Sequence, residues 1–382
     1  MTFVIRFALL CGIANRVDPL YSGTAVSRGE TMLSTKSLPG RGLAAAVVVV
    51  LGVLWQAAPG SAQEMPIFRI GAAATAGSFF EVGGVLASAI SKPAASAPCE
   101  QGGSCGVPGL VAVAQATQGS VDNLRMIASD QIESGIAQSD VASWAYAGTG
   151  IFAGEGPIKN LRAIASLFPE RLHLVVRAAG PIQTLKDLKG RHISLGQVGS
   201  GTLVDARITL AAGGLAEKDL SPEYLRSGTA AANLSEGTLE GFFLIGGVPI
   251  PAIRALAGTT AIRLIPIPDD VLTTMHEKYG PYDRAMIPAD IYPGVNVATP
   301  TVGFHALWVV SVNASDDLIY AITKALWNEA TQRLLDAHDP IGKQVRLANA
   351  LDGLTIPLHL GAKRFYREAG MSVGDGPLGA PD

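Results

Sequence analysis

Short apolar segments alternate with segments of helical spacing along most of this 382-residue chain. Residues 68–72 and 133–140 have the apolar character of buried strands, and residues 77–90 and 141–146 follow them with helical spacing. Such alternation is typical of α/β proteins with a largely parallel sheet. The pattern continues through a second half of similar size, so we expect two α/β lobes with a cleft between them.

One strand–helix junction in the second half is built on glycines. Residues 191–195 predict a short strand, the turn Gly196-Gln197-Val198-Gly199-Ser200-Gly201-Thr202 follows, and residues 203–210 have helical spacing. A helix start of this kind presents free backbone N–H groups to an anion, and glycines let a ligand approach the backbone closely. The turn lacks the Lys of a Walker loop and the Gly-x-Ser-x-Gly of a hydrolase elbow. Taken alone, it fits ligand binding and an ordinary strand–helix turn equally well.

Polar residues also stand at other predicted strand ends, the edge at which open α/β sheets bind their ligands. Most of them are neutral hydrogen-bond donors, which suits binding better than catalysis. One such polar segment, Phe168-Pro169-Glu170, is predicted to join two separate strands at residues 162–167 and 173–177. We expect five segments to converge on the cleft: residues 75–80, 138–140, 168–170, 199–202 and 246–247.

The N-terminal region has the features of a secretory signal peptide. Lys36 and Arg41 precede an apolar run at residues 43–55, and Gly60-Ser61-Ala62 offers a cleavage site. The apolar run is shorter than the ~20 residues that a membrane span needs. A cleaved signal peptide is therefore expected, and the alternative is an uncleaved N-terminal anchor.

Signal peptides usually begin near the initiator Met, whereas about thirty residues precede this one. We therefore expect translation to start at Met32, with residues 1–31 arising from a misassigned start site. The signal peptide then covers residues 32–62, and the mature chain begins at Gln63.

Charge and cysteine content narrow the class of protein further. The first 62 residues carry five basic and two acidic side chains, so their removal takes the formal net charge from −3 to −6. An acidic secreted chain argues against nucleic acid and anionic membranes as partners. Cys11 lies in the removed segment, whereas Cys99 and Cys105 remain and predict a small disulfide loop in an oxidising compartment. No further ligands with zinc spacing lie nearby, so no metal is expected.

The sequence gives little support for catalysis. None of its six histidines forms an i, i+4 metal pair. Ser200 with a distant histidine would make a hydrolase, but an anion-binding serine needs fewer assumptions. Asp140 and Glu170 are an alternative acid/base pair, although such residues more often cap helices or lie at lobe edges.

With these segments placed, the chain resembles the TAXI subgroup of solute receptors from tripartite ATP-independent periplasmic (TRAP) transporters, from about Phe68 to Met371. The order and spacing of several short motifs carry the resemblance. They are Ile70-Gly71, Gly77-Ser78-Phe79-Phe80, Gly83, Cys105-Gly106-Val107-Pro108-Gly109-Leu110, Gly119-Ser120-Val121-Asp122-Asn123, Ile136-Ala137-Gln138-Ser139-Asp140-Val141-Ala142, Ala165-Ser166-Leu167-Phe168-Pro169-Glu170, Leu185-Lys186-Asp187-Leu188-Lys189-Gly190 and Gly199-Ser200-Gly201-Thr202.

The resemblance implies the two-lobe type II periplasmic-binding-protein fold, with mixed, mostly parallel sheets, a hinge and an interlobe cleft. It implies a periplasmic receptor, without enzyme activity or cofactor, that passes a small organic anion or an amino acid such as glutamate to membrane permease subunits. On this basis residues 63–172 form the first part of lobe 1, residues 173–311 form lobe 2, and residues 312–382 are helices that return to lobe 1.

The ligand-binding residues expected on these grounds come from both lobes. They are Thr75, Ser78, Phe79, Phe80, Gln138, Ser139, Phe168, Glu170, Gly199, Ser200, Gly201, Thr202 and Gly246. Ser200 and Thr202 are expected to donate hydrogen bonds to a ligand carboxylate. No residue is expected to be catalytic.

The chain departs from the family pattern at several positions. Phe79, Phe80 and Phe168 stand where such receptors commonly have Tyr, which keeps the apolar ring and removes a hydrogen-bonding hydroxyl. Glu81 stands where Pro is usual, and Glu240-Gly241 replaces the common Asp-Ala. These changes favour a less polar carboxylate. Two alternatives stay open: a secreted hydrolase that uses the same cleft, and a solute-sensing partner of a receptor kinase.

Overall fold

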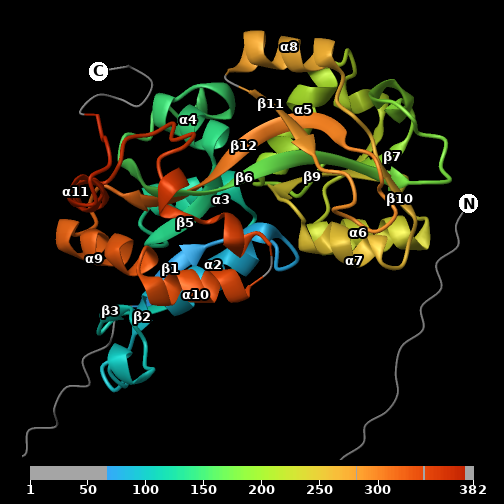
Figure 1. Cartoon of the computed structure of the whole chain (residues 1–382). Helices are drawn as coiled ribbons and strands as arrows, with labels where there is room; N and C mark the ends of the chain where they lie inside the picture. Colours follow the sequence, from blue (N-terminus) through green and yellow to red (C-terminus); the bar gives the residue numbers. More distant parts are fainter. Residues whose placement is uncertain (1–66, 281, 339, 375–382) are drawn as a thin grey trace, which may run out of the picture. The chain divides into compact units, whose positions relative to one another are not determined.

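The central sheet is mixed and has the strand order β4-β1-β5-β12-β6-β9-β7-β8, with β10 paired to β6 and β11 to β12 (Figure 1). The structure is a computed structural model that describes residues 67–280, 282–338 and 340–374. Its large sheet contains β1 (Ile67–Gly71), β4 (Val111–Gln115), β5 (Ser134–Gln138), β6 (Leu161–Arg177), β7 (His192–Ser194), β8 (Ser221–Glu223), β9 (Gly241–Gly247), β10 (Ile262–Leu264), β11 (Asp283–Ile287) and β12 (Thr299–Ser311).

Strand direction divides the sheet into two parallel flanks and an antiparallel centre. The flank β4-β1-β5 is parallel, and so is the flank β9-β7-β8. The long strands β6 and β12 pair antiparallel with each other and connect the two flanks. The predicted mixed α/β class is confirmed.

Strand β6 corrects one expectation. Residues 161–177 form one continuous strand of 17 residues, rather than two strands joined across residues 168–170. Its pairing with β12 is irregular between Ala306 and Leu307, next to the position where His305 faces Pro169. Proline has no backbone N–H to donate, and a local irregularity lets the strand continue past it. Glu170 therefore lies in the middle of a buried strand rather than at a strand end.

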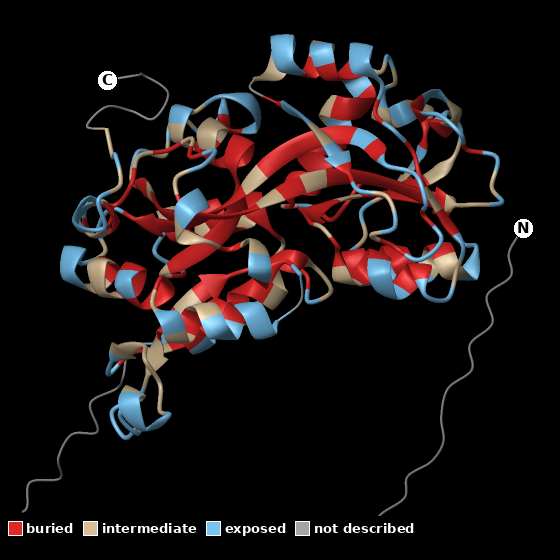
Figure 2. Cartoon of the chain, in the orientation of Figure 1, coloured by how far each residue is buried: buried red, intermediate tan, exposed pale blue. Residues whose placement is uncertain are grey.

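The helices cover the sheet and leave their outer faces exposed (Figure 2). They are α2 (Ser78–Ile90), α3 (Ser120–Ala128), α4 (Ser139–Ala147), α5 (Gly201–Ala212), α6 (Ser227–Glu236), α7 (Pro251–Ala257), α8 (Asp269–Tyr279), α9 (Asp316–Leu326), α10 (Glu329–Ala337) and α11 (Leu360–Glu368). None of the helices in the described residues is long and apolar enough to cross a bilayer.

Buried side chains form separate cores around the two flanks of the sheet. One core surrounds β4-β1-β5 and takes side chains from residues 68–167 and from the C-terminal helices. Two further cores lie within residues 172–304, around β9-β7-β8. We call the first part lobe 1 and the second lobe 2. The boundaries 63–172, 173–311 and 312–382 stay a prediction.

The predicted disulfide is confirmed. Cys99 and Cys105 are bonded, with their Cα atoms 4.8 Å apart. The loop they close lies between the two short strands β2 (Ser91–Lys92) and β3 (Val107–Pro108), which pair with each other. The predicted signal peptide, the cleavage site at residues 60–62 and the start at Met32 lie outside the described residues.

Candidate functional site

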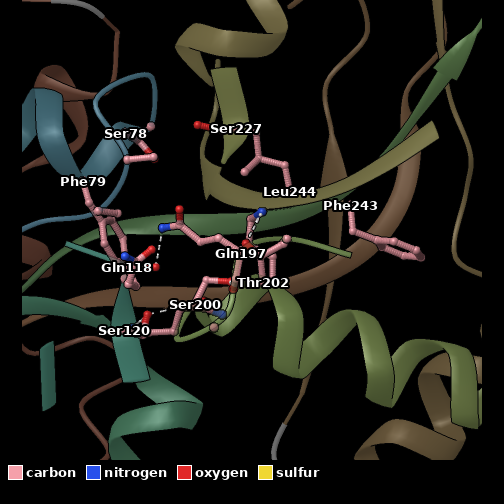
Figure 3. Close-up of a pocket in the computed structure, with 18 of the residues that line it drawn as sticks. Ser78, Phe79, Gln118, Ser120, Gln197, Ser200, Thr202, Ser227, Phe243 and Leu244 are labelled. Atoms are coloured by element: carbon pink, nitrogen blue, oxygen red, sulfur yellow. Dashed lines mark hydrogen bonds between the residues drawn. The ribbon is translucent and has the colours of Figure 1, made fainter. Parts of the chain in front are cut away.

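A small pocket lies between the lobes, with a cavity of about 60 Å³. Lobe 1 and lobe 2 both contribute to its wall (Figure 3). Its lining residues are Ala73, Ala74, Gly77, Ser78, Phe79, Gln118, Gly119, Ser120, Gln138, Glu170, Gly196, Gln197, Ser200, Gly201, Thr202, Leu225, Ser227, Ala230, Phe243, Leu244 and Ile245. Most of these residues are small, and several are hydroxyl or amide donors.

Four helices begin at this pocket. Ser78 is the first residue of α2, Ser120 of α3, Gly201 of α5 and Ser227 of α6, and all four line the cavity. The first N–H groups of a helix have no partner within the helix, and the helix dipole makes that end positive. Helices of both lobes thus present their positive ends to one small space, which favours a negatively charged group there.

The glycine-rich turn shapes the start of α5. Gly196 and Gly199 have φ values of +97° and +86°, which side chains rarely adopt. Ser200 is the N-cap residue: its Oγ accepts from the Leu203 N–H at 3.1 Å and donates to the Gln197 carbonyl at 2.6 Å. The hydroxyl expected to donate to a ligand is therefore engaged in capping the helix. Thr202 Oγ1 accepts from the Ile245 N–H at 3.1 Å and keeps its own proton available.

Hydrogen bonds join the lobes around the cavity. Gln138 Nε2 in lobe 1 donates to Asp205 Oδ2 in lobe 2 at 2.8 Å. The Asp122 N–H donates to the Gly199 carbonyl at 3.1 Å, and the Gly247 N–H donates to Ser78 Oγ at 3.0 Å. These bonds cross from lobe to lobe, so the structure shows the lobes in contact.

A buried carboxyl pair lies behind Gln138. Asp140 and Asp205 come from lobe 1 and lobe 2, and Tyr282 donates to Asp205 Oδ1 at 3.0 Å. Burial raises the pKa of Asp140 to about 6. Burial and the neighbouring Asp140 charge raise the pKa of Asp205 well above its ordinary value. The pair therefore retains a proton more readily than exposed carboxyls do.

Glu170 lines the pocket itself and is completely buried. Neither of its carboxylate oxygens has a hydrogen-bond partner. Burial raises its pKa well above the ordinary value, the Asp140 charge raises it further, and the Arg171 guanidinium opposes both. Among the described residues, Glu170 is the only ionisable side chain in the lining.

The expected site residues fall into two groups. Seven of them line the pocket: Ser78, Phe79, Gln138, Glu170, Ser200, Gly201 and Thr202. The structure places six others outside the lining: Thr75, Phe80, Ser139, Phe168, Gly199 and Gly246.

The residues outside the lining have other environments. Thr75 is exposed, and Phe80 packs against the core of lobe 1. Phe168 lies behind Phe79 in an edge-to-face contact, with ring centroids 6.3 Å apart. Ser139 Oγ accepts from the His305 N–H at 3.2 Å. Gly199 and Gly246 are neighbours of lining residues in the chain.

Several lining residues were not expected from the sequence. Ser120 and Ser227 each begin a helix, as Ser78 does, and the shared Gly-Ser helix start at residues 77–78 and 119–120 was a usable signal. Gln118 and Gln197 lie in loops, where the sequence carries no pattern that would single out an amide.

A family model for the NMT1-like family matches residues 70–370 of the chain. The chain belongs to the NMT1-like family. Solved structures with a partly similar shape include the alkanesulfonate-binding protein SsuA from Xanthomonas axonopodis pv. citri bound to MOPS. It has 16% identity and a TM-score of 0.41, and the match covers 79% of this chain and 83% of that one.

A second structure similar to this NMT1-like chain is the substrate-binding protein of an amino acid ABC transporter. It has 13% identity and a TM-score of 0.40, and the match covers 71% of this chain and 98% of that one. At such low similarity, neither structure says what this chain binds.

Proposed function

We propose that this protein is a periplasmic receptor that binds a small carboxylate-bearing solute between its two lobes. The observation that carries the proposal is the meeting of four helix N-termini, two from each lobe, around one small cavity. Their free N–H groups and positive ends would hold a carboxylate without any basic side chain. Because both lobes contribute, the solute would stabilise the closed arrangement.

We further propose that the receptor serves a TRAP-type transporter and belongs to the TAXI subgroup. The support is the resemblance of its motifs, among them the segments at residues 136–142 and 165–170, to that subgroup. Uptake of the solute by cells that carry the receptor and its permease would then depend on an ion gradient. Uptake that persists without the gradient and requires ATP would place the receptor with ABC transporters instead.

Thermal unfolding in the presence of a panel of small carboxylates tests the binding function. A solute at 100 times its dissociation constant adds about 2.7 kcal/mol to the free energy of unfolding, so the midpoint should rise by several degrees. NMR spectra of the same mixtures should show the solute unchanged after prolonged incubation. If no carboxylate of the panel raises the midpoint of thermal unfolding, the receptor function would be contradicted. Steady conversion of the solute would favour a hydrolase function.

A further inference from the structure

Two buried carboxyl groups meet at the contact between the lobes. Asp140 lies in the first turn of α4 in lobe 1, and Asp205 lies in α5 of lobe 2. Asp205 is completely buried, and Asp140 has 8% of its surface exposed. The two carboxyls are within hydrogen-bonding reach of each other. Two carboxylates at this distance only repel, whereas a carboxylic acid and a carboxylate form a strong hydrogen bond.

The donors around the carboxyl pair all serve Asp205. Its Oδ2 accepts from Gln138 Nε2 at 2.8 Å, and its Oδ1 accepts from the Tyr282 hydroxyl at 3.0 Å. Neither oxygen of Asp140 has a hydrogen-bond partner among the described residues. Buried polar atoms without partners are costly, and the great majority in folded proteins are hydrogen-bonded. A proton shared between the two carboxyls supplies the missing bond.

Neighbouring elements bring other titratable groups toward the pair. They are Glu170 and Arg171 on β6, Tyr279 on α8, Tyr282 before β11 and His305 on β12. A charged Glu170 would add a third negative charge beside Asp140, and Arg171 acts on Glu170 and Asp283. Burial raises the pKa of Tyr282 far above neutrality, so its hydroxyl stays a donor. Burial lowers the pKa of His305, which leaves that ring neutral at pH 7.

The pair is connected to the pocket through Gln138. This side chain lines the cavity and donates to Asp205 across the lobes. Asp140 and Asp205 themselves lie outside the lining, so they act on the contact between the lobes rather than on the solute. Because each lobe supplies one carboxyl, separation of the lobes would expose both to water.

We propose that the lobes close on the solute together with one proton, which Asp140 and Asp205 share across the lobe contact. Solute binding then takes up a proton from solvent, and opening of the lobes releases the solute and the proton together. This inference rests on the proposed receptor function and adds a regulation to it.

The sign of the pH dependence follows from the two states of the pair. In the open receptor both carboxyls would be exposed, with an ordinary pKa near 4. Burial raises the pKa of both in the closed arrangement, and the N–H groups at the start of α4 offset this only in part for Asp140. Affinity should therefore fall as pH rises above about 5, by up to about tenfold per pH unit.

Calorimetry on the full chain tests the proton uptake without any variant. The probes are propionate, pyruvate, succinate and glutamate, and the one that binds best is used throughout. Its affinity should fall about tenfold or more between about pH 6 and about pH 8, a range in which its carboxylates stay charged. Near pH 7 the heat of binding should vary with the ionisation enthalpy of the buffer, in the sense of proton uptake.

The variant Asp140→Asn replaces the shared proton by an amide, whose N–H can donate to the Asp205 carboxylate at any pH. The fall in affinity over the same pH range should shrink to about threefold or less, and proton uptake should disappear. At about pH 8 this variant should bind the probe more tightly than the wild type does. A purely structural role of Asp140 would instead weaken binding at every pH.

Two further variants serve as controls. Asp290→Asn lies at an exposed position with a φ of +60°, which Asn tolerates well, and should keep the pH dependence of the wild type. Glu170→Gln removes the other buried carboxyl of the region. It should keep the fall in affinity with pH, whatever its effect on the affinity itself.

The outcomes separate this inference from the receptor function. A probe that binds equally tightly at both ends of the pH range would overturn the shared proton and leave the receptor standing. The same holds if Asp140→Asn keeps the full pH dependence, or if Glu170→Gln alone abolishes it. If none of the probes binds, both proposals fail.

Discussion

At the scale of single residues, the protein concentrates its unusual chemistry in a few buried carboxyls. Asp140 and Asp205 are both buried at the junction of the lobes, and Glu170 is buried in the pocket wall. The sequence indicated Asp140 and Glu170 as polar positions near the cleft, but not their burial. Burial depends on which strands and helices surround a residue. The sequence alone does not show which distant segments these are.

The Asp140 carboxyl should make stability depend on pH. Its pKa in the folded protein is raised to about 6 by burial, above the ~4 of an unfolded chain. Between these values the folded state binds more protons than the unfolded state, so the free energy of unfolding should fall as pH rises from about 4 to about 6. Asp140→Asn should remove part of that fall, on the order of 1–3 kcal/mol. Denaturant unfolding at several pH values measures this pH dependence. An equal fall in the free energy of unfolding of both proteins would contradict a raised pKa of Asp140 in the folded state.

At the scale of elements, periodicity predicted most strands and helices, and tertiary pairing decided the exceptions. Residues 161–177 were expected as two strands because Pro169 interrupts the apolar pattern, yet pairing with β12 keeps them continuous. Residues 316–337 form two helices, α9 and α10, rather than one. Asn328 causes the division, since its side chain accepts from the Thr331 N–H and caps a new helix.

The helix starts explain why the site was only partly predictable. The glycine-rich turn at residues 196–202 has a sequence signature, and the structure places it in the pocket. The start of α6 at Ser227-Gly228-Thr229 has the same three residue types as Ser200-Gly201-Thr202, but a short repeat of this kind does not place the two helix starts together. The place of the α6 start in the cavity follows from the sheet order, which depends on contacts between distant segments.

The N-cap of α5 provides a test at this scale. Ser200→Ala and Ser315→Ala each remove a capping bond, to the N–H of Leu203 and of Leu318, and each should cost about 1 kcal/mol of stability. Only Ser200 caps a helix that begins at the pocket, so only Ser200→Ala should also weaken solute binding. Chemical denaturation and calorimetry measure the two effects. If both variants bind the solute with equal affinity, the start of α5 does not take part in solute binding.

At the scale of the whole molecule, the proposed function depends on the contact between the lobes. Gly201 lies at that contact: a Cβ atom there would be 1.7 Å from Gln138 Oε1. Gly201→Ala should therefore displace the Gln138 side chain from its bond to Asp205 across the lobes. The weakened lobe contact should lower apparent affinity by about tenfold or more, because the binding-competent state becomes rare.

Small-angle scattering and calorimetry together check this expectation. The Gly201→Ala protein should have a larger radius of gyration than the wild type in the presence of solute. Gly84→Ala is the matched control, since a Cβ at Gly84 meets nothing within 4 Å. A Gly201→Ala protein that closes and binds like the wild type would show that lobe contact at this glycine is dispensable.

The central claim is that one solute is held by helix starts from both lobes. Hydrogen exchange of backbone amides, measured with and without the carboxylate that binds best, tests it directly. The account predicts slower exchange on binding in the first turns of all four helices, α2, α3, α5 and α6, because their free N–H groups gain an acceptor. Protection confined to one lobe, or to segments away from these turns, would contradict it.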